Sequence, residues 1–341
     1  MTVTAAIFSL FLKIFAGGAL LALVIVLALL FDGADRIVHA RMQRRVGPPL
    51  FQPLLDILKL MGKENIVPRR AVRFFFTAAP WLALASTLMV FLYIPVGPFP
   101  AVLGTEGDMI LVLYLLALGG VAMATGGFAS GNPIAGIGAG REITLMMSYE
   151  FPLAVVVTTL AWVAHKTGMP GAPFSLETFT SASIWQSVGK IGAFGLACLF
   201  LSLVMVVPGE TGKGPMDIPE AKTEILDGLI IEYSGVNLAL LKATFALRSF
   251  AMASFTTSIL VTCSISGMLG VGGFLVAILD FFFFWAKVFA VQMIFVTLMR
   301  TAFGRLKIWQ ASKFYLVKAA GLSLAGMLLL SIDVMTRVNG L

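Results

Sequence analysis

Long apolar runs recur along the whole chain and are separated by polar or charged connections. A helix of about twenty apolar residues is long enough to cross the hydrocarbon core of a bilayer. We therefore predict eight membrane-spanning helices, at about 5–31, 74–94, 109–129, 143–164, 190–207, 236–264, 274–298 and 314–335. This pattern predicts an all-α integral membrane protein in which residues 1–341 form a single polytopic domain.

The connections between these runs are charged unequally. Connections 32–73, 130–142, 208–235 and 299–313 hold sixteen lysines and arginines, whereas the alternate connections and the termini hold three. Because basic connections tend to remain in the cytoplasm, we predict a cell-membrane protein with this first set cytoplasmic and both termini outside. The net charge of +7 is thus a topology signal and does not indicate nucleic-acid binding. The first run has no charged n-region and no small-residue cleavage site, so we expect a retained span.

An acidic stretch, 207–235, lies between the fifth and sixth predicted spans. Six of the seventeen acidic residues of the chain lie in it: Glu210, Asp217, Glu220, Glu224, Asp227 and Glu232. A short helix starting near Asp217 would place the middle four acids within an arc of about 80°. Such a row must be hydrated, paired or partly protonated, because like charges at helical spacing repel one another. The helix dipole explains acids in a first turn but not those further along, so we interpret 207–235 as an acidic coupling loop.

The longest connection, 32–73, is predicted to be a cytoplasmic docking segment. Several arginines follow the first span, Gly47-Pro48-Pro49 then ends the helical pattern, and apolar residues recur at helical spacing near 52–63. That spacing predicts an amphipathic helix lying on the membrane or under a partner. The arginines are either lipid anchors or bidentate donors to a partner's carboxylates, and we favour docking. The predicted docking cations are Arg36, Arg41, Arg44, Arg45, Arg300, Arg305 and Lys307.

Ionisable residues, among them Arg248, also lie within or at the ends of the predicted spans. At a lipid-facing helix centre each would cost about 2.5–3.5 kcal/mol, so they must face the interior, form pairs or line water. A buried pair that holds helices together is the structural alternative to an ion or proton path. We predict that the path consists of the acids of the 207–235 loop together with Glu142, Glu150, Lys242, Asp280 and Lys287.

Composition excludes several other classes of site. The chain is 59% apolar and 12% charged, against about 25% charged residues in soluble domains. Its two cysteines, Cys198 and Cys263, are far apart and are expected to be small buried hydrophobes. With no CxxC and two histidines, the chain is not expected to bind a metal or iron–sulfur cluster by itself, nor to hold catalytic residues. The GIGAG run at 136–140 lacks the βαβ context of a nucleotide loop.

Several motifs in the same order resemble one family. They are ARMQRRVGPPLFQPLLDILKL (40–60), GREITLMMSYE (140–150), GETGKGPMDIPEAKTEI (209–225), IEYSG (231–235) and the cluster Arg300, Arg305 and Lys307. Over about 32–313 the chain resembles the membrane subunit that anchors the peripheral arm in respiratory complex I. It is equally similar to the homologous subunit of membrane-bound, energy-converting nickel–iron hydrogenases.

Two departures from the complex I pattern favour the hydrogenase branch. After RMQ, complex I subunits carry approximately GPNRVGPxGLLQP, whereas here Gly47-Pro48-Pro49 is followed almost at once by Gln52-Pro53. The loop also departs from ETNRAPFDLPEAESEL at Gly212, Lys213, Met216 and Lys222. These changes put a quinone chamber in doubt, although Glu210, Asp217, Glu220 and Glu224 are retained.

The resemblance implies a non-redox subunit of a membrane-bound oxidoreductase that couples electron transfer from ferredoxin to protons, forming H2, to proton or sodium translocation. Iron–sulfur clusters and a nickel–iron centre are expected on peripheral hydrogenase-like large and small subunits, beside antiporter-like membrane subunits and lipid. If the complex I alternative held, quinone would replace protons as the electron acceptor. Two further alternatives are a non-catalytic anchor and a stand-alone secondary transporter with Glu150 and Asp280 as ligands, although no internal repeat is evident.

Overall fold

The computed structural model describes residues 3–104, 107–181, 183–266 and 273–338. Within these ranges there is no β-strand, and eight helices are long and apolar enough to cross a membrane. The α-helices are α1 (Val3–Met42), α2 (Gln52–Met61), α3 (Arg73–Tyr93), α4 (Met109–Ala129), α5 (Pro133–Lys166), α6 (Leu176–Ser181), α7 (Ile184–Ser187), α8 (Lys190–Thr211), α9 (Lys222–Ile225), α10 (Gly235–Leu260), α12 (Phe274–Gln292), α13 (Met299–Ala302), α14 (Ile308–Lys313) and α15 (Ala320–Val338). The predicted all-α membrane fold is confirmed.

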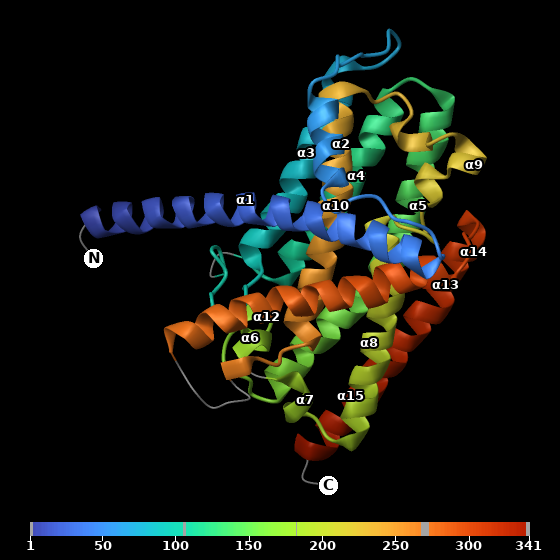
Figure 1. Cartoon of the computed structure of the whole chain (residues 1–341). Coiled ribbons are helices and arrows are strands. Elements are labelled where there is room, and N and C mark those ends of the chain that lie inside the picture. The colour runs from blue at the N-terminus through green and yellow to red at the C-terminus, as the bar shows by residue number, and fades with distance from the viewer. Residues whose placement is uncertain (1–2, 105–106, 182, 267–272, 339–341) are drawn as a thin grey trace.

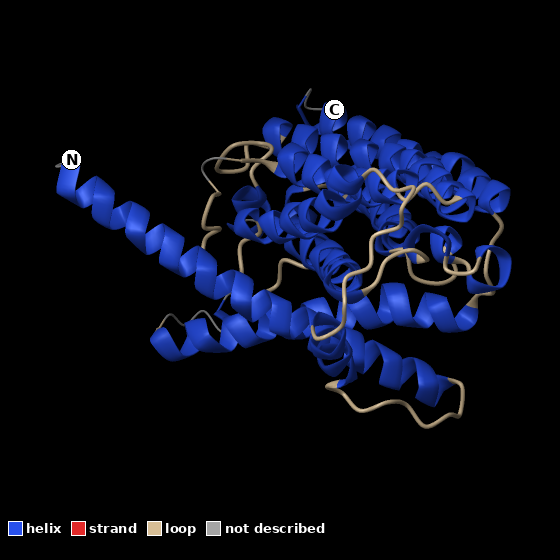
Figure 2. Ribbon diagram, turned by 90° about the horizontal axis from the view of Figure 1, so that it is seen from above, coloured by secondary structure: helices blue, strands red, loops and turns tan. Residues whose placement is uncertain are grey.

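Helix α10 lies at the centre of the bundle and packs against α1, α2, α3, α8 and α12. Of the eight spans it is the most buried, with 72% of its apolar window inside the protein, against 22% for α1. Helices α3, α4 and α5 pack in sequence on one flank, and α8 packs against α15 on another. Figure 1 shows α1 and α12 lying across the other spans, and in Figure 2 the first half of α1 extends away from the bundle.

Three spans continue beyond their predicted ends toward the basic connections. Helix α1 runs to Met42 and α8 runs through Pro208 to Thr211. Helix α5 begins at Pro133, where the Asn132 side chain accepts a hydrogen bond from the Ile134 amide at 2.8 Å. Apolar run length therefore underestimated these helices, because a helix ends where a cap or breaker stops it and not where its residues become polar.

The last two spans are not regular α-helices throughout. The seventh contains a π turn, η3 (Met293–Leu298), and the eighth contains another, η4 (Phe314–Ala319). Such bulges are frequent near functional sites, and both lie close to the 299–313 connection. The predicted amphipathic helix is present as α2, which packs on α10 and α1 and exposes Leu55, Leu58 and Met61.

The two predicted sets of connections lie at opposite ends of the bundle. At the basic end, Ile66 N–H donates to Ser234 Oγ at 2.9 Å, and Leu306 N–H donates to the Pro215 carbonyl at 3.1 Å. At the other end, Met109 N–H donates to the Phe174 carbonyl at 2.9 Å. This segregation agrees with the alternation of spans, while the assignment of the basic end to the cytoplasm remains a prediction.

Candidate functional site

A buried cluster of charged residues joins α5, α8 and α10 near the acidic loop. The extension of α8 places Glu210 on its last turn, and the early start of α5 places Glu142 well inside that helix. Arg248, on α10, donates from Nη1 to Glu142 Oε1 and from Nη2 to Glu210 Oε1, both at 3.1 Å. Its Nη2 also donates to the Tyr149 hydroxyl at 3.3 Å. A single guanidinium therefore links three spans of the bundle.

This network is closed to solvent. Arg248 is 1% exposed, Glu210 2% and Glu142 7%. The cluster holds one more carboxylate than it has cations, and keeping both carboxylates ionised in the interior is unfavourable. Sequence reasoning noted Arg248 but did not include it in the site. The signal that could have identified Arg248 was its position inside the most buried span, in a chain whose other spans carry acids.

Glu220 lies between this network and the surface. It ends a short 3₁₀ turn, η1 (Ile218–Glu220), that packs on α5, and its Oε1 is buried with no hydrogen-bond partner among the described residues. Burial first, and then the carboxylates of Glu142, Asp227 and Asp217, raise the pKa of Glu220 to about 8. A carboxyl group with this pKa exchanges its proton near neutral pH.

Glycines allow the acidic loop to approach α5 closely. A Cβ at Gly138 would lie 2.5 Å from the Leu229 amide nitrogen and 3.0 Å from the Pro219 carbonyl oxygen. The GIGAG run of 136–140 is therefore part of a helix that receives the loop backbone. The close contact positions Glu220 against the helix that carries Glu142 and Glu150.

A short 3₁₀ turn begins after Asp217, but the predicted helix that would carry four acids on one face is wrong. The loop instead forms η1, α9 and η2 (Gly228–Ile230), with Leu226 and Asp227 in left-handed conformations at φ 50° and 68°. Four of its acids have separate partners, because the turns spread charges that one helix face would have crowded together. The ion pairs are Asp217 with Arg305, Glu224 with Arg141 at 2.6 Å and Asp227 with Lys222 at 3.6 Å, and Glu232 accepts a hydrogen bond from Asn132.

A cavity of about 690 Å³ opens beside the loop. Charges of both signs face it, including Glu220, Asp227 and the exposed Lys242. Aromatic and aliphatic side chains, among them Tyr233 and Phe245, complete its wall. Glu220 lies on the wall of this cavity at the basic end of the protein.

A second charged cluster closes the same cavity. Lys213 Nζ lies 2.8 Å from Asp32 Oδ1 and 3.1 Å from Asp35 Oδ2, and Arg300 Nη1 lies 3.3 Å from Asp35 Oδ2. Burial opposes the Lys213 charge, but attraction to Asp32 and Asp35 outweighs it and raises the pKa of Lys213. Thr297, in π turn η3, donates to Asp35 Oδ1 at 2.6 Å. Sequence reasoning missed these two aspartates, which follow the first apolar run directly.

The predicted docking cations divide into two groups. Arg36, Arg300 and Arg305 are engaged with acids of this chain. Arg41, Arg44, Arg45 and Lys307 are exposed at the basic end, and none of them has an ion-pair partner among the described residues. The second group is therefore the one available to a partner.

The remaining predicted path residues lie in two places. Glu150 is half-buried on α5, and its Oε1 has no hydrogen-bond partner within the described part of the chain. Asp280 and Lys287 instead line a separate cavity of about 400 Å³, where both side chains bond to backbone groups. In the described ranges no group of three or more histidine, cysteine or acidic side chains could hold a metal.

Comparison with known proteins relates this architecture to respiratory membrane complexes. The chain is 35% identical over 236 residues to hydrogenase-4 component C of Escherichia coli, covering 68% of this chain and 70% of that protein. It is 30% identical over 288 residues to a subunit of the NADH-quinone oxidoreductase of Syntrophotalea carbinolica, covering 79% and 84%. Formate hydrogenlyase subunit 4 of E. coli is 28% identical over 249 residues, covering 73% and 78%.

A solved structure shows the same fold. The structure of the membrane-bound sulfane sulfur reductase, an archaeal respiratory membrane complex, contains a chain that matches with a TM-score of 0.78 and 28% identity. The match covers 93% of this chain and 99% of that chain. The sequence also matches the NADH dehydrogenase family (NADHdh) over residues 16–331. This chain therefore belongs to the NADH dehydrogenase family, whose relatives named here are membrane subunits of oxidoreductase complexes.

Proposed function

We propose that this chain couples a redox reaction in a peripheral arm to ion movement in the membrane. The observation that carries the proposal is that Glu220 lies on the wall of the loop cavity and feels the charge of Glu142. Glu142 and Glu210 are in turn bonded to Arg248 inside the bundle. A charge change in the arm would alter the proton occupancy of Glu220. Because Glu142 lies in its electrostatic field, the occupancy of the buried network would respond.

Docking of the arm is the second part of the proposal. Arg41, Arg44, Arg45 and Lys307 are exposed at the end where the acidic loop opens. The neighbouring α2 presents an apolar stripe, with Leu55, Leu58 and Met61 between 52% and 57% exposed. A cluster-bearing subunit with an acidic, partly apolar surface would bind here and bring its redox centre close to Glu220.

The proposed reaction transfers electrons from ferredoxin to protons, with iron–sulfur clusters and a nickel–iron centre on hydrogenase-like large and small subunits. Antiporter-like membrane subunits would carry protons or sodium. One relative is a hydrogenase-4 component and another is a formate hydrogenlyase subunit, and 35% identity to the first supports this branch. The loop cavity of about 690 Å³ supports one alternative, a quinone chamber of the NADH-quinone oxidoreductase type. Membership of a family of complex subunits makes a stand-alone transporter the weaker candidate.

Amide substitution tests the coupling role. We expect Glu220→Gln and Glu150→Gln to leave the complex assembled with its metal centres, because glutamine keeps the size and most hydrogen bonds of glutamate. Ion uptake by proteoliposomes per electron transferred should fall severalfold, because neither amide can exchange a proton.

Glu224→Gln is the matched control. It lies in the same loop, but its carboxylate is exposed and paired with Arg141 at 2.6 Å. This variant should pump like the wild type. Unchanged uptake per electron in both the Glu220 and Glu150 variants would show that these carboxylates are scaffolding.

A further inference from the structure

The C-terminal end of α10 lies away from the acidic loop, at the opposite end of the bundle. The helix ends at Leu260, and residues 261–264 continue as non-helical backbone. The last carbonyls of a helix have no partner within it, and a protein surrounded by lipid cannot leave them unpaired. Three side chains from elsewhere in the chain bond to the backbone between residues 260 and 266.

Two donors satisfy the carbonyl groups. Trp185 Nε1 donates to the Leu260 carbonyl at 2.9 Å. Lys287 Nζ donates to the Val261 carbonyl at 2.8 Å and to the Cys263 carbonyl at 2.7 Å. A cation is well suited to this position, because the C-terminus of a helix carries partial negative charge.

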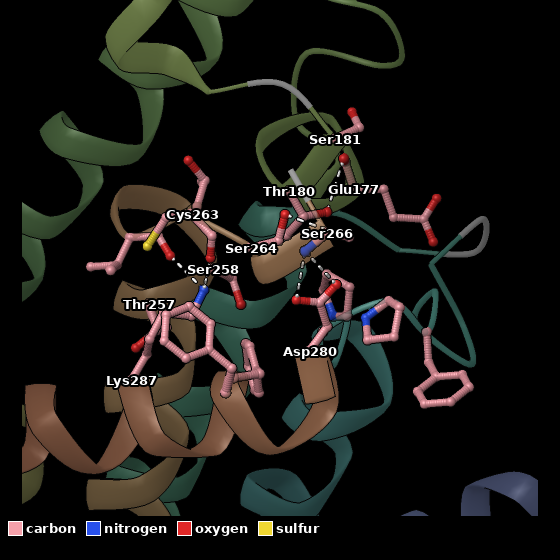
Figure 3. A pocket seen from close by; sticks show the side chains of 18 of the residues that line it. Glu177, Thr180, Ser181, Thr257, Ser258, Cys263, Ser264, Ser266, Asp280 and Lys287 are labelled. Atoms are coloured by element: carbon pink, nitrogen blue, oxygen red, sulfur yellow. Dashed lines mark hydrogen bonds between the residues drawn. The ribbon is translucent and has the colours of Figure 1, made fainter. Parts of the chain in front are cut away.

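Asp280 satisfies the amide groups that follow. Its Oδ1 accepts from Ile265 N–H at 2.6 Å and from Ser266 N–H at 3.3 Å. Asp280 is 5% exposed and lies on the wall of the cavity of about 400 Å³. Figure 3 shows Asp280 and Lys287 rising from α12 toward the same segment.

The spacing of Asp280 and Lys287 on α12 explains why both side chains reach the same backbone segment. Seven positions are almost two helical turns, so both side chains project from one face of α12. The 95–100 loop packs on the same place, since a Cβ at Gly97, where φ is 59°, would lie 3.0 Å from the Asp280 carbonyl oxygen.

We propose that Asp280 and Lys287 form a paired backbone cap that holds segment 261–266 against α12, and that they are not carriers on the ion route. Each side chain uses its charge on fixed backbone dipoles: the carboxylate on two amides, the ammonium on two carbonyls. A carrier has to gain and lose charge in each cycle. Removing the oxygen acceptors of Asp280 or the nitrogen donor of Lys287 would release the backbone groups that they satisfy.

Amide hydrogen exchange of the purified complex tests the cap directly. We expect Asp280→Leu to speed exchange of the Ile265 and Ser266 amides about tenfold, because the buried acceptor is lost. Lys287→Met should speed exchange in the same segment by releasing its carbonyls, whereas Lys287→Arg should not. The Gly189 amide, which donates to Asp333 Oδ2 at 2.7 Å at the same end, is the internal control and should not change. Wild-type exchange in both Asp280→Leu and Lys287→Met overturns the proposal.

Asp280→Asn separates a cap from a carrier. Its amide oxygen still accepts hydrogen bonds but cannot exchange a proton at neutral pH, so protection of Ile265 and Ser266 and ion uptake per electron should both be retained. Normal exchange combined with lost uptake would make Asp280 a carrier and overturn the proposal. If Asp280→Leu does not assemble, the comparison of Asp280→Asn with wild type still distinguishes a cap from a carrier. The exchange measurement needs no pumping, so it is independent of the coupling proposal.

Discussion

The two ends of the bundle use buried charge in different ways. At the acidic-loop end, Arg248 faces the carboxylates of Glu142 and Glu210, with Glu220 close behind. At the opposite end, Asp280 and Lys287 face backbone amides and carbonyls. Titratable groups that interact with one another can redistribute protons, whereas backbone dipoles have fixed charge. Charged side chains within the membrane can thus take part in coupling at one end and stabilise the backbone at the other.

Removing the central cation should have the largest effect. In Arg248→Met, Glu142 and Glu210 remain buried without a cation beside them, which we expect to cost about 3–5 kcal/mol. The complex should unfold at a clearly lower temperature in detergent, or fail to accumulate in membranes.

Arg305→Met is the matched control at the same end. It removes a partly exposed ion pair with Asp217, which should contribute about 0–1 kcal/mol. Equal losses in the two arginine variants would contradict the distinction between the buried network and the surface pairs.

Charge reversal compares the surfaces of the two ends. Arg44→Glu combined with Arg45→Glu should release peripheral subunits from washed membranes, because repulsion replaces attraction at the proposed docking surface. Lys166→Glu with Lys190→Glu makes the same change in net charge on exposed residues at the opposite end and should leave the complex intact. Retention of an active complex by the arginine variant at high salt would identify those arginines as lipid anchors.

The pH dependence of stability tests the acidic-loop end in another way. The pKa of Glu220 is raised from 4.5 to about 8, so the folded protein binds more protons than the unfolded chain between these values. The contribution of Glu220 to stability therefore decreases as pH rises from 4.5 to about 8 and then stays constant. Glu220→Gln should lose this dependence and gain stability relative to wild type between pH 5 and 8. Thermal unfolding of the complex at several pH values measures it, and Glu224→Gln should retain the wild-type profile.

Much of the architecture could be predicted from apolar run length and charge asymmetry. These properties are local, because a span must be long and apolar wherever its neighbours lie. Eight spans, α2 and the grouping of basic connections followed from them. The helix ends did not: α1, α5 and α8 extend further because caps and breakers end helices, and two of these extensions place Glu142 and Glu210 beside Arg248.

The sequence by itself determined which residues must be satisfied inside the membrane, since burying an unpaired charge is costly in any fold. It identified the acids of the loop together with Glu142, Glu150, Asp280 and Lys287. Only the tertiary structure decided their partners. Arg248 and Glu142 are 106 positions apart, and Lys287 reaches carbonyls 24 and 26 positions away. Such pairings depend on how helices cross, which no local spacing encodes, so similar intramembrane charges could acquire a coupling role at one end and a capping role at the other.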